Sequence, residues 1–132
     1  MEIRLQAFES LDSTNNYLKK LAAEGAAEGT VVIADEQTAG RGRMGRSFAS
    51  AAGCGIYMSM LLRPADCTPD CAQSLTAVCA VAVCRAVEKV CGRAPGIKWI
   101  NDLYLRGKKI CGILCESSVK NGKVDYAVLG IG

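Results

Sequence analysis

The sequence predicts an α+β domain in which helices pack on one face of a mixed, mostly antiparallel sheet. Two helical segments are separated by short apolar and β-branched runs, a pattern typical of strands. Pairs of turn residues in the last third of the chain join neighbouring strands directly, which favours antiparallel pairing. The predicted order is strand, helix, two strands, helix and three strands, in one domain over residues 1–132.

The first half of the chain contains a strand, a helix and two further strands. Residues 2–9 alternate between polar and apolar side chains, as a half-buried strand does. Three N-cap candidates at 12–14 precede a helical run over 15–24, in which apolar residues share one face. Residues 30–34 and 55–62 are apolar runs of strand length, and we expect both strands to be buried.

A long helix begins the second half. Thr68 fits an N-cap, Pro69 fits the first helical position, and Gly92 fits the end of a helix that runs to about Val90. Because alanine, valine and cysteine occupy most of its faces, we expect this helix to be largely buried.

Short strands and tight turns fill the remainder. Residues 97–100 predict a short strand, and residues 103–116 predict a hairpin with its turn at 106–108. Asn121-Gly122 is a strong tight-turn pair, and a last strand covers 124–131. This strand pattern continues almost to the last residue, so we expect the sheet of a longer domain to be interrupted here.

Composition excludes several classes of protein. A net charge of +3, from 16 basic and 13 acidic residues, is too mild for nonspecific nucleic-acid binding. The N-terminal residues alternate and carry charge, unlike a signal peptide, and no uncharged apolar run reaches about 18 residues. We therefore expect a cytoplasmic protein without a membrane partner.

The eight cysteines are interpreted as small hydrophobic residues in a reduced compartment. No two cysteines have the Cys-x-x-Cys spacing and the chain has no histidine, which argues against a zinc site. A disulfide framework is the alternative, but nothing marks the chain as secreted. We expect no metal held by protein side chains alone.

Three segments carry candidate chemistry. In residues 40–46, arginines alternate with glycines: glycines let the backbone approach an anion, and arginines offer planar cationic forks. A solvated basic loop or an RNA-binding tract remains the alternative. Lys98 lies on a strand before Asn101, where it binds an anion or simply reaches solvent from an edge strand. Residues 12–15 either only cap a helix or also receive a polar ligand.

Together these segments resemble one family, the biotin–protein ligases, also called biotin–acetyl-CoA-carboxylase ligases. The resemblance covers nearly the whole chain and rests on motifs in this order: Asp12-Ser13-Thr14-Asn15, Gln37-Thr38-Ala39-Gly40-Arg41-Gly42-Arg43-Met44-Gly45-Arg46, Ile56-Tyr57-Met58-Ser59, Lys98-Trp99-Ile100-Asn101-Asp102-Leu103 and Gly112-Ile113-Leu114-Cys115-Glu116. It implies the fold of biotin and lipoate ligases, which is like that of class II aminoacyl-tRNA synthetases. Here that fold would be a catalytic core truncated at the C-terminus, with neither the N-terminal DNA-binding domain nor the C-terminal β-barrel domain of some members.

The resemblance also implies roles for individual residues. Lys98 and Arg43 would be catalytic, at the junction of the biotin carboxylate and the ATP phosphates. The biotin site would contain Ser13, Thr14, Asn15, Gln37, Gly40, Arg41, Gly42, Arg43, Lys98, Gly112 and Leu114. The nucleotide site would contain Arg43, Arg46, Phe48 and Asn101, with Phe48 stacked on adenine. As in glycine-rich lids generally, we expect residues 40–50 to be mobile without ligand.

The implied activity is the formation of biotinyl-5'-AMP from biotin and ATP with Mg²⁺, followed by transfer of biotin to a lysine of a biotin carboxyl carrier protein. No DNA partner is expected, and a homodimer is left open. One alternative is a non-catalytic biotin-binding module or fragment, because the family's nucleotide-contacting strand end lies beyond Gly132. Another is a lipoate or octanoyl transferase of the same superfamily.

Overall fold

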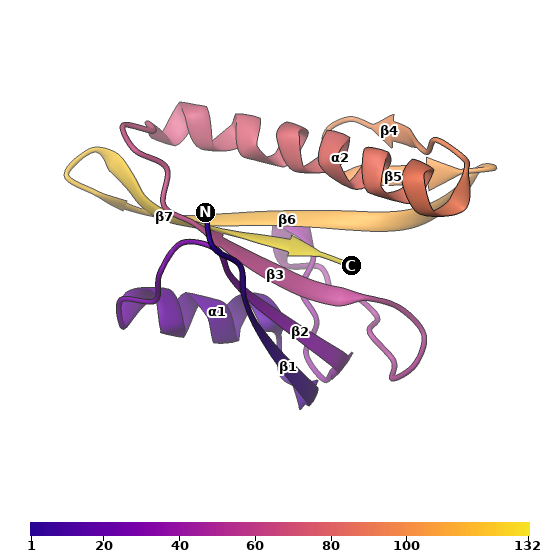
Figure 1. Ribbon diagram of the computed structural model, residues 1–132, viewed down its shortest axis with the longest axis horizontal. Helices are drawn as coiled ribbons and strands as arrows, with labels where there is room; N and C mark the ends of the chain where they lie inside the picture. The colour runs from indigo at the N-terminus through magenta and orange to yellow at the C-terminus, as the bar shows by residue number, and fades with distance from the viewer.

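A seven-stranded mixed sheet forms the centre of the computed structural model, which describes residues 1–132 (Figure 1). Only β1 and β2 pair in parallel. In the order in which they lie in the sheet, the strands are β1 (Arg4–Leu11), β2 (Thr30–Gln37), β3 (Tyr57–Leu62), β7 (Lys123–Ile131), β6 (Lys108–Lys120), β5 (Asp102–Leu105) and β4 (Gly96–Lys98). The mixed, mostly antiparallel α+β class is confirmed, and four strands follow the second helix, as the individually predicted segments require, although the predicted order counted three.

The two helices cover opposite faces of the sheet, so the predicted packing on one face is wrong (Figure 1). The reason lies in β7, whose central residues are buried on both sides. Val128 packs in the cluster of α1 (Thr14–Ala23), and the next residue, Leu129, packs in the cluster of α2 (Pro69–Cys91). Because successive side chains of a strand point to opposite faces, a continuous apolar run requires a cover on each face.

Helix α1 is held at both ends. The Ser13 side chain accepts a hydrogen bond from the Asn16 backbone N–H, which makes Ser13 the N-cap. At the other end, the guanidinium of Arg63 donates to the Ala22 carbonyl oxygen at 2.7 Å, which suits the negative end of a helix. Between them, Leu18 is fully buried against the sheet. The predicted helix and cap region are confirmed.

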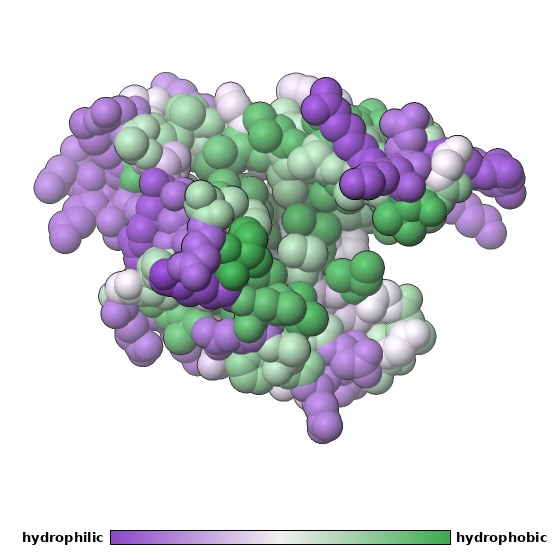
Figure 2. All heavy atoms as spheres, viewed as in Figure 1, coloured by the Kyte–Doolittle hydropathy of each residue, from purple (hydrophilic) through white to green (hydrophobic).

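Helix α2 has the predicted cap Thr68 and the predicted end at Gly92, which takes a left-handed conformation. The predicted burial is wrong, because only one stripe of the helix faces the sheet. Val78 is 65% exposed and Val90 is 84% exposed. In the space-filling view, apolar residues accordingly reach the surface along α2 at the top of the molecule (Figure 2). Neither helix combines the length and the apolar character that crossing a membrane requires.

Strand β6 changes partners along its length. It pairs with β5 through Lys108–Gly112 and with β7 from Ile113 to Lys120. The turns on either side of it are tight: Arg106-Gly107 and Asn121-Gly122 all have positive φ, which is the conformation that two-residue hairpins require. Both predicted turns are confirmed. The long β6 therefore connects the small β4–β5 hairpin to the centre of the sheet.

The cysteines are all free, and five of the eight are buried or half-buried, which fits their interpretation as small hydrophobic residues. Cys79 and Cys111 are buried in the cluster beneath α2, while Cys54, Cys71 and Cys91 are exposed. Burial raises the pKa of both Cys79 and Cys111 to about 11, because an apolar environment disfavours the thiolate. Nothing in the structure explains the three exposed cysteines.

We predict that Leu61→Ala lowers the free energy of unfolding by about 2–5 kcal/mol, since Leu61 is fully buried between β3 and α1 and its truncation leaves a cavity. Val78→Ala on the exposed side of α2 is the matched control and should change it by less than about 0.5 kcal/mol. Urea unfolding followed by circular dichroism measures both. Equal losses would contradict the assignment of the core.

We also predict that iodoacetamide near neutral pH modifies Cys54, Cys71 and Cys91 well before Cys79 and Cys111. The thiolate is the reactive form, and burial with a raised pKa suppresses it. Peptide mass spectrometry over a time course measures the order of labelling, and labelling after unfolding in urea is the control. If Cys79 were modified as fast as the exposed cysteines, the packing of α2 against the sheet would be contradicted.

Candidate functional site

An open pocket lies between the start of α1, the glycine–arginine loop at residues 40–48, and strands β6 and β7. Many residues predicted for the site line it: Ser13, Thr14, Asn15, Gln37, Arg41, Gly42, Arg43, Phe48, Asn101, Gly112 and Leu114. Sequence segments far apart in the chain therefore meet in one cavity.

The side chain of Asn15 forms part of the pocket floor and is 3% exposed. Its amide nitrogen donates to the Leu114 carbonyl oxygen at 3.3 Å and to Glu116 Oε2 at 3.0 Å. Its amide oxygen accepts from the Ser59 hydroxyl at 2.5 Å. A Cβ atom on Gly130 would lie 2.3 Å from this oxygen, so β7 needs glycine there. The amide donors of Asn15 are thus already used within the protein.

Gln37 closes the neighbouring side of the pocket. Its amide oxygen accepts hydrogen bonds from the backbone N–H of Thr14 at 2.9 Å and from the Thr14 hydroxyl at 3.0 Å. Its amide nitrogen donates to the Ser50 hydroxyl at 2.8 Å, which ties the end of the loop to β2. Ser13 remains available: its oxygen accepts from Asn16, and its own hydroxyl proton points to no partner in the protein.

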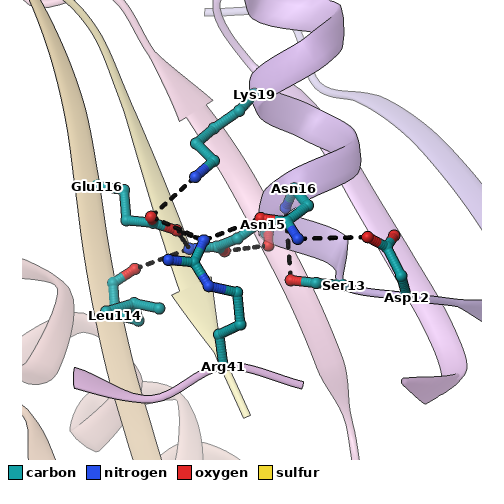
Figure 3. A network of polar contacts seen from close by, with 9 residues as sticks. Asp12, Ser13, Asn15, Asn16, Lys19, Arg41, Leu114 and Glu116 are labelled. Carbon is teal, nitrogen blue, oxygen red and sulfur yellow. Dashed lines mark hydrogen bonds and ion pairs between the residues drawn. The ribbon is translucent and has the colours of Figure 1, made fainter. Parts of the chain in front are cut away.

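Glu116 is the centre of a polar network that joins β6, α1 and the loop (Figure 3). It accepts from Lys19 Nζ at 2.8 Å and from Arg41 Nη1 at 2.9 Å, in addition to Asn15. Burial favours the neutral acid, but the hydrogen bonds from Lys19 and Asn15 and the charges of Lys19 and Arg41 outweigh it. The pKa of Glu116 is lowered below its ordinary value.

The opposite wall carries a line of polar contacts from the loop to β6. Arg43 Nη1 donates to Asn101 Oδ1 at 2.9 Å, and Asn101 Nδ2 donates to Asp102 Oδ1 at 3.1 Å. Lys109 Nζ lies 2.8 Å from the same Asp102 oxygen. Arg43 and Lys109 therefore place two positive charges on one wall, where an anionic group could meet both.

Lys109, which the sequence interpretation did not name, lines the pocket, whereas Lys98, which it did name, does not. Lys98 lies on the outer strand β4 with its ammonium 5.5 Å from the centre of the Tyr104 ring. Lys109 reaches the pocket at a β-bulge: Leu103 pairs with Cys111 and Tyr104 with Lys109, so β6 contains one extra residue. Regular alternation would have placed Lys109 with Cys111 on the α2 face.

Two other predicted residues also lie outside the pocket lining. Gly40 has a structural reason to be glycine, because a Cβ atom there would lie 2.3 Å from the Phe48 carbonyl oxygen. Arg46 is exposed, and its carbonyl oxygen closes the loop by accepting from the Gly42 N–H at 2.7 Å. Phe48 does line the pocket, with its ring against Gly112 and Gly132. A Cβ atom on either glycine would displace that ring.

No cluster of three or more histidine, cysteine, aspartate or glutamate side chains in the structure could hold a metal ion. The pocket itself offers neutral hydrogen-bonding groups near α1 and two cations near β6. This arrangement suits an elongated ligand with an uncharged polar end and an anionic end.

Comparison with known proteins assigns this chain to a family. The chain matches the biotin/lipoate A/B protein ligase family over residues 7–132. It is 44% identical over 122 residues to the bifunctional ligase/repressor BirA of Bacillus subtilis, covering 92% of this chain and 37% of that protein. It is 42% identical over 123 residues to a biotin–[acetyl-CoA-carboxylase] ligase of Paracoccus denitrificans, covering 92% and 50% of the two chains.

Solved structures agree with the sequence matches. The biotin protein ligase of Leishmania major in complex with biotinyl-5-AMP superposes with a TM-score of 0.84 at 29% identity, covering 100% of this chain and 57% of that one. The biotin protein ligase of Aquifex aeolicus in complex with biotin and ATP gives 0.80 at 34% identity, covering 97% and 50%. The chain thus spans between about a third and three-fifths of these relatives. Because the family model covers nearly all of it, the chain belongs to the biotin/lipoate A/B protein ligase family.

Proposed function

We propose that this chain is the biotin- and adenylate-binding core of a biotin–protein ligase. The activity would be the formation of biotinyl-5'-AMP from biotin and ATP and the transfer of biotin to a lysine of a biotin carboxyl carrier protein. One observation carries the proposal: a single pocket combines neutral polar groups at the start of α1 with Arg43 and Lys109 on the facing wall. Relatives of similar fold are described in complex with biotin, ATP and biotinyl-5-AMP.

The polarity of the pocket sets the orientation of the ligand. The ureido group of biotin is neutral and needs hydrogen-bond donors and acceptors, which Ser13 and Gln37 supply near α1. The valerate carboxylate would then extend toward Lys109, past Gly112 and Leu114 on β6. Asn15 takes part indirectly, since its amide donors are used by Leu114 and Glu116.

The chemistry needs positive charge more than it needs a nucleophilic side chain. A biotin carboxylate oxygen attacks the α-phosphorus of ATP, an O–P bond forms, and pyrophosphate leaves with the electrons of the broken P–O bond. The approaching groups are both anionic, and fixed cations reduce their repulsion. Lys109 and Arg43 occupy the wall where these anions would meet. We therefore assign to Lys109 the role expected of Lys98.

The second step uses an amine from outside the chain. The carrier lysine attacks the biotinyl carbonyl carbon, and AMP leaves as the new amide forms. Mg²⁺ would accompany ATP and would be held partly by its phosphates. Arg43, Phe48 and Asn101 remain the proposed nucleotide contacts. Some relatives are named as repressors, so the absence of a DNA partner stays a prediction.

We predict that labelled biotin, Mg²⁺-ATP and a carrier domain incubated with this chain yield labelled carrier, because one pocket would hold both anions against their repulsion. Calorimetry should show biotin binding that tightens when ATP is present. Omission of ATP is the control. If biotin binds but ATP neither tightens its binding nor gives biotinyl-5'-AMP, the result favours the non-catalytic module. If lipoate displaces biotin, the result favours a lipoate transferase. If neither biotin nor lipoate binds, the proposal is refuted.

We also predict that Lys109→Gln slows biotinyl-5'-AMP formation roughly 100-fold, the effect typical of losing one group that stabilises a transition-state charge. Lys98→Gln is the matched control, and it should change the rate less than about twofold because Lys98 lies against Tyr104 outside the pocket. Single-turnover kinetics with excess protein measure both rates. A larger loss in the Lys98 variant would restore the assignment made from sequence.

A further inference from the structure

Glu116 lies outside the pocket lining, yet it contacts both of the segments that form the pocket's α1 side (Figure 3). One carboxylate oxygen accepts from Lys19 Nζ at 2.8 Å and from Arg41 Nη1 at 2.9 Å. The other accepts from Asn15 Nδ2 at 3.0 Å and lies 3.2 Å from the same Arg41 nitrogen. A single carboxylate thus binds the first two turns of α1 and the first arginine of the loop.

This network uses one nitrogen of the Arg41 guanidinium and pairs the charge of Arg41 with a carboxylate. Arg41 Nη1 donates to Glu116 and, at 2.8 Å, to Asn16 Oδ1. The side chain of Glu116 is 20% exposed and that of Arg41 is 41% exposed, so the pair is partly shielded from water. The lowered pKa of Glu116 keeps the carboxylate ionised near neutral pH.

The loop has a second tether on the other side of the pocket. Arg43 Nη1 donates to Asn101 Oδ1 at 2.9 Å, next to β5. Between the tethers, the backbone closes on itself through the Gly42 N–H and the Phe48 N–H, which donate to the carbonyl oxygens of Arg46 and Gly40. The loop is therefore a small closed unit suspended between two side-chain anchors. Of these two, only the Arg41 anchor is an ion pair.

We propose that Glu116 is a positioning residue, whose carboxylate holds the glycine–arginine loop in place over the pocket through Arg41 and orients the Asn15 amide in the pocket floor. Loop and floor consequently share one anchor, and Arg43 rather than Arg41 is the loop's cation for the ligand. The identity of that ligand rests on the proposed function, but the anchor itself does not.

Limited trypsin digestion of the ligand-free chain tests the anchor without any reference to biotin. In Glu116→Gln the shape of the side chain is kept and its charge is lost, so cleavage after Arg43 and Arg46 should accelerate about fivefold, as expected for the loss of a charge pair of this strength. Glu88→Gln on α2 removes the same charge from an exposed site and should leave these rates unchanged. Mass spectrometry identifies each cleaved bond.

A double-mutant cycle tests whether Glu116 acts on the loop through its ion pair with Arg41 or through a general loosening of the fold. Arg41→Ala should accelerate cleavage after Arg43 and Arg46 to the same degree as Glu116→Gln, and the double variant should be no faster than either. Unchanged cleavage in Glu116→Gln, or additive effects in the double variant, would overturn the proposal. So would uniformly faster cleavage at tryptic sites throughout the chain, because that is the signature of a structural role alone.

The effect of biotin on loop cleavage then distinguishes a failure of this proposal from a failure of the proposed function. If biotin protects the wild-type loop, Glu116→Gln should raise the KM for biotin in adenylate formation more than it lowers kcat, since the loop must first be ordered. If biotin gives no protection while Glu116→Gln still frees the loop, the proposed function fails and the anchor stands. A kcat loss without a change in KM would contradict positioning.

Discussion

The side-chain amide of Asn15 is the contact on which the pocket depends. It lies in the first turn of α1, bonds to Ser59 on β3 and to Leu114 and Glu116 on β6, and fills the space that Gly130 leaves on β7. An unpaired amide group at this depth would cost about 1–3 kcal/mol, so each contact constrains the others. The start of α1 is thereby fixed against three strands, and the helix N-terminus faces the cavity.

The same strands that carry the pocket also carry the core of the opposite face. On β7, Gly130 makes room for Asn15 on one side, while Leu129 packs beneath α2 on the other. On β6, Leu114 lines the pocket and Cys115 packs against α2. Because alternate residues of each strand serve different faces, the same strands hold both the pocket floor and the packing beneath α2.

Features set by local interactions could be predicted from the sequence, and features set by register could not. The caps of both helices and the two hairpin turns were identified, because each depends on a few neighbouring residues. The bulge that brings Lys109 into the pocket has no such signal: Ile110 is an ordinary strand residue, and it is extra only because the register between β6 and β5 leaves it without a partner. Lys98 was chosen because it lies on a strand just before Asn101 and within the motif that resembles the biotin–protein ligases.

The balance of charge explains how the pocket can hold several cations without a ligand. Arg41 is paired with Glu116, Lys109 is paired with Asp102, and Arg43 is bonded only to the neutral amide of Asn101. Arg43 is thus the pocket cation whose charge has no acidic partner, and an anion gains most by approaching it. Lys109 must share its charge with Asp102, which holds the ammonium in position before any ligand arrives. Such fixed charges need little reorganisation when an anion enters.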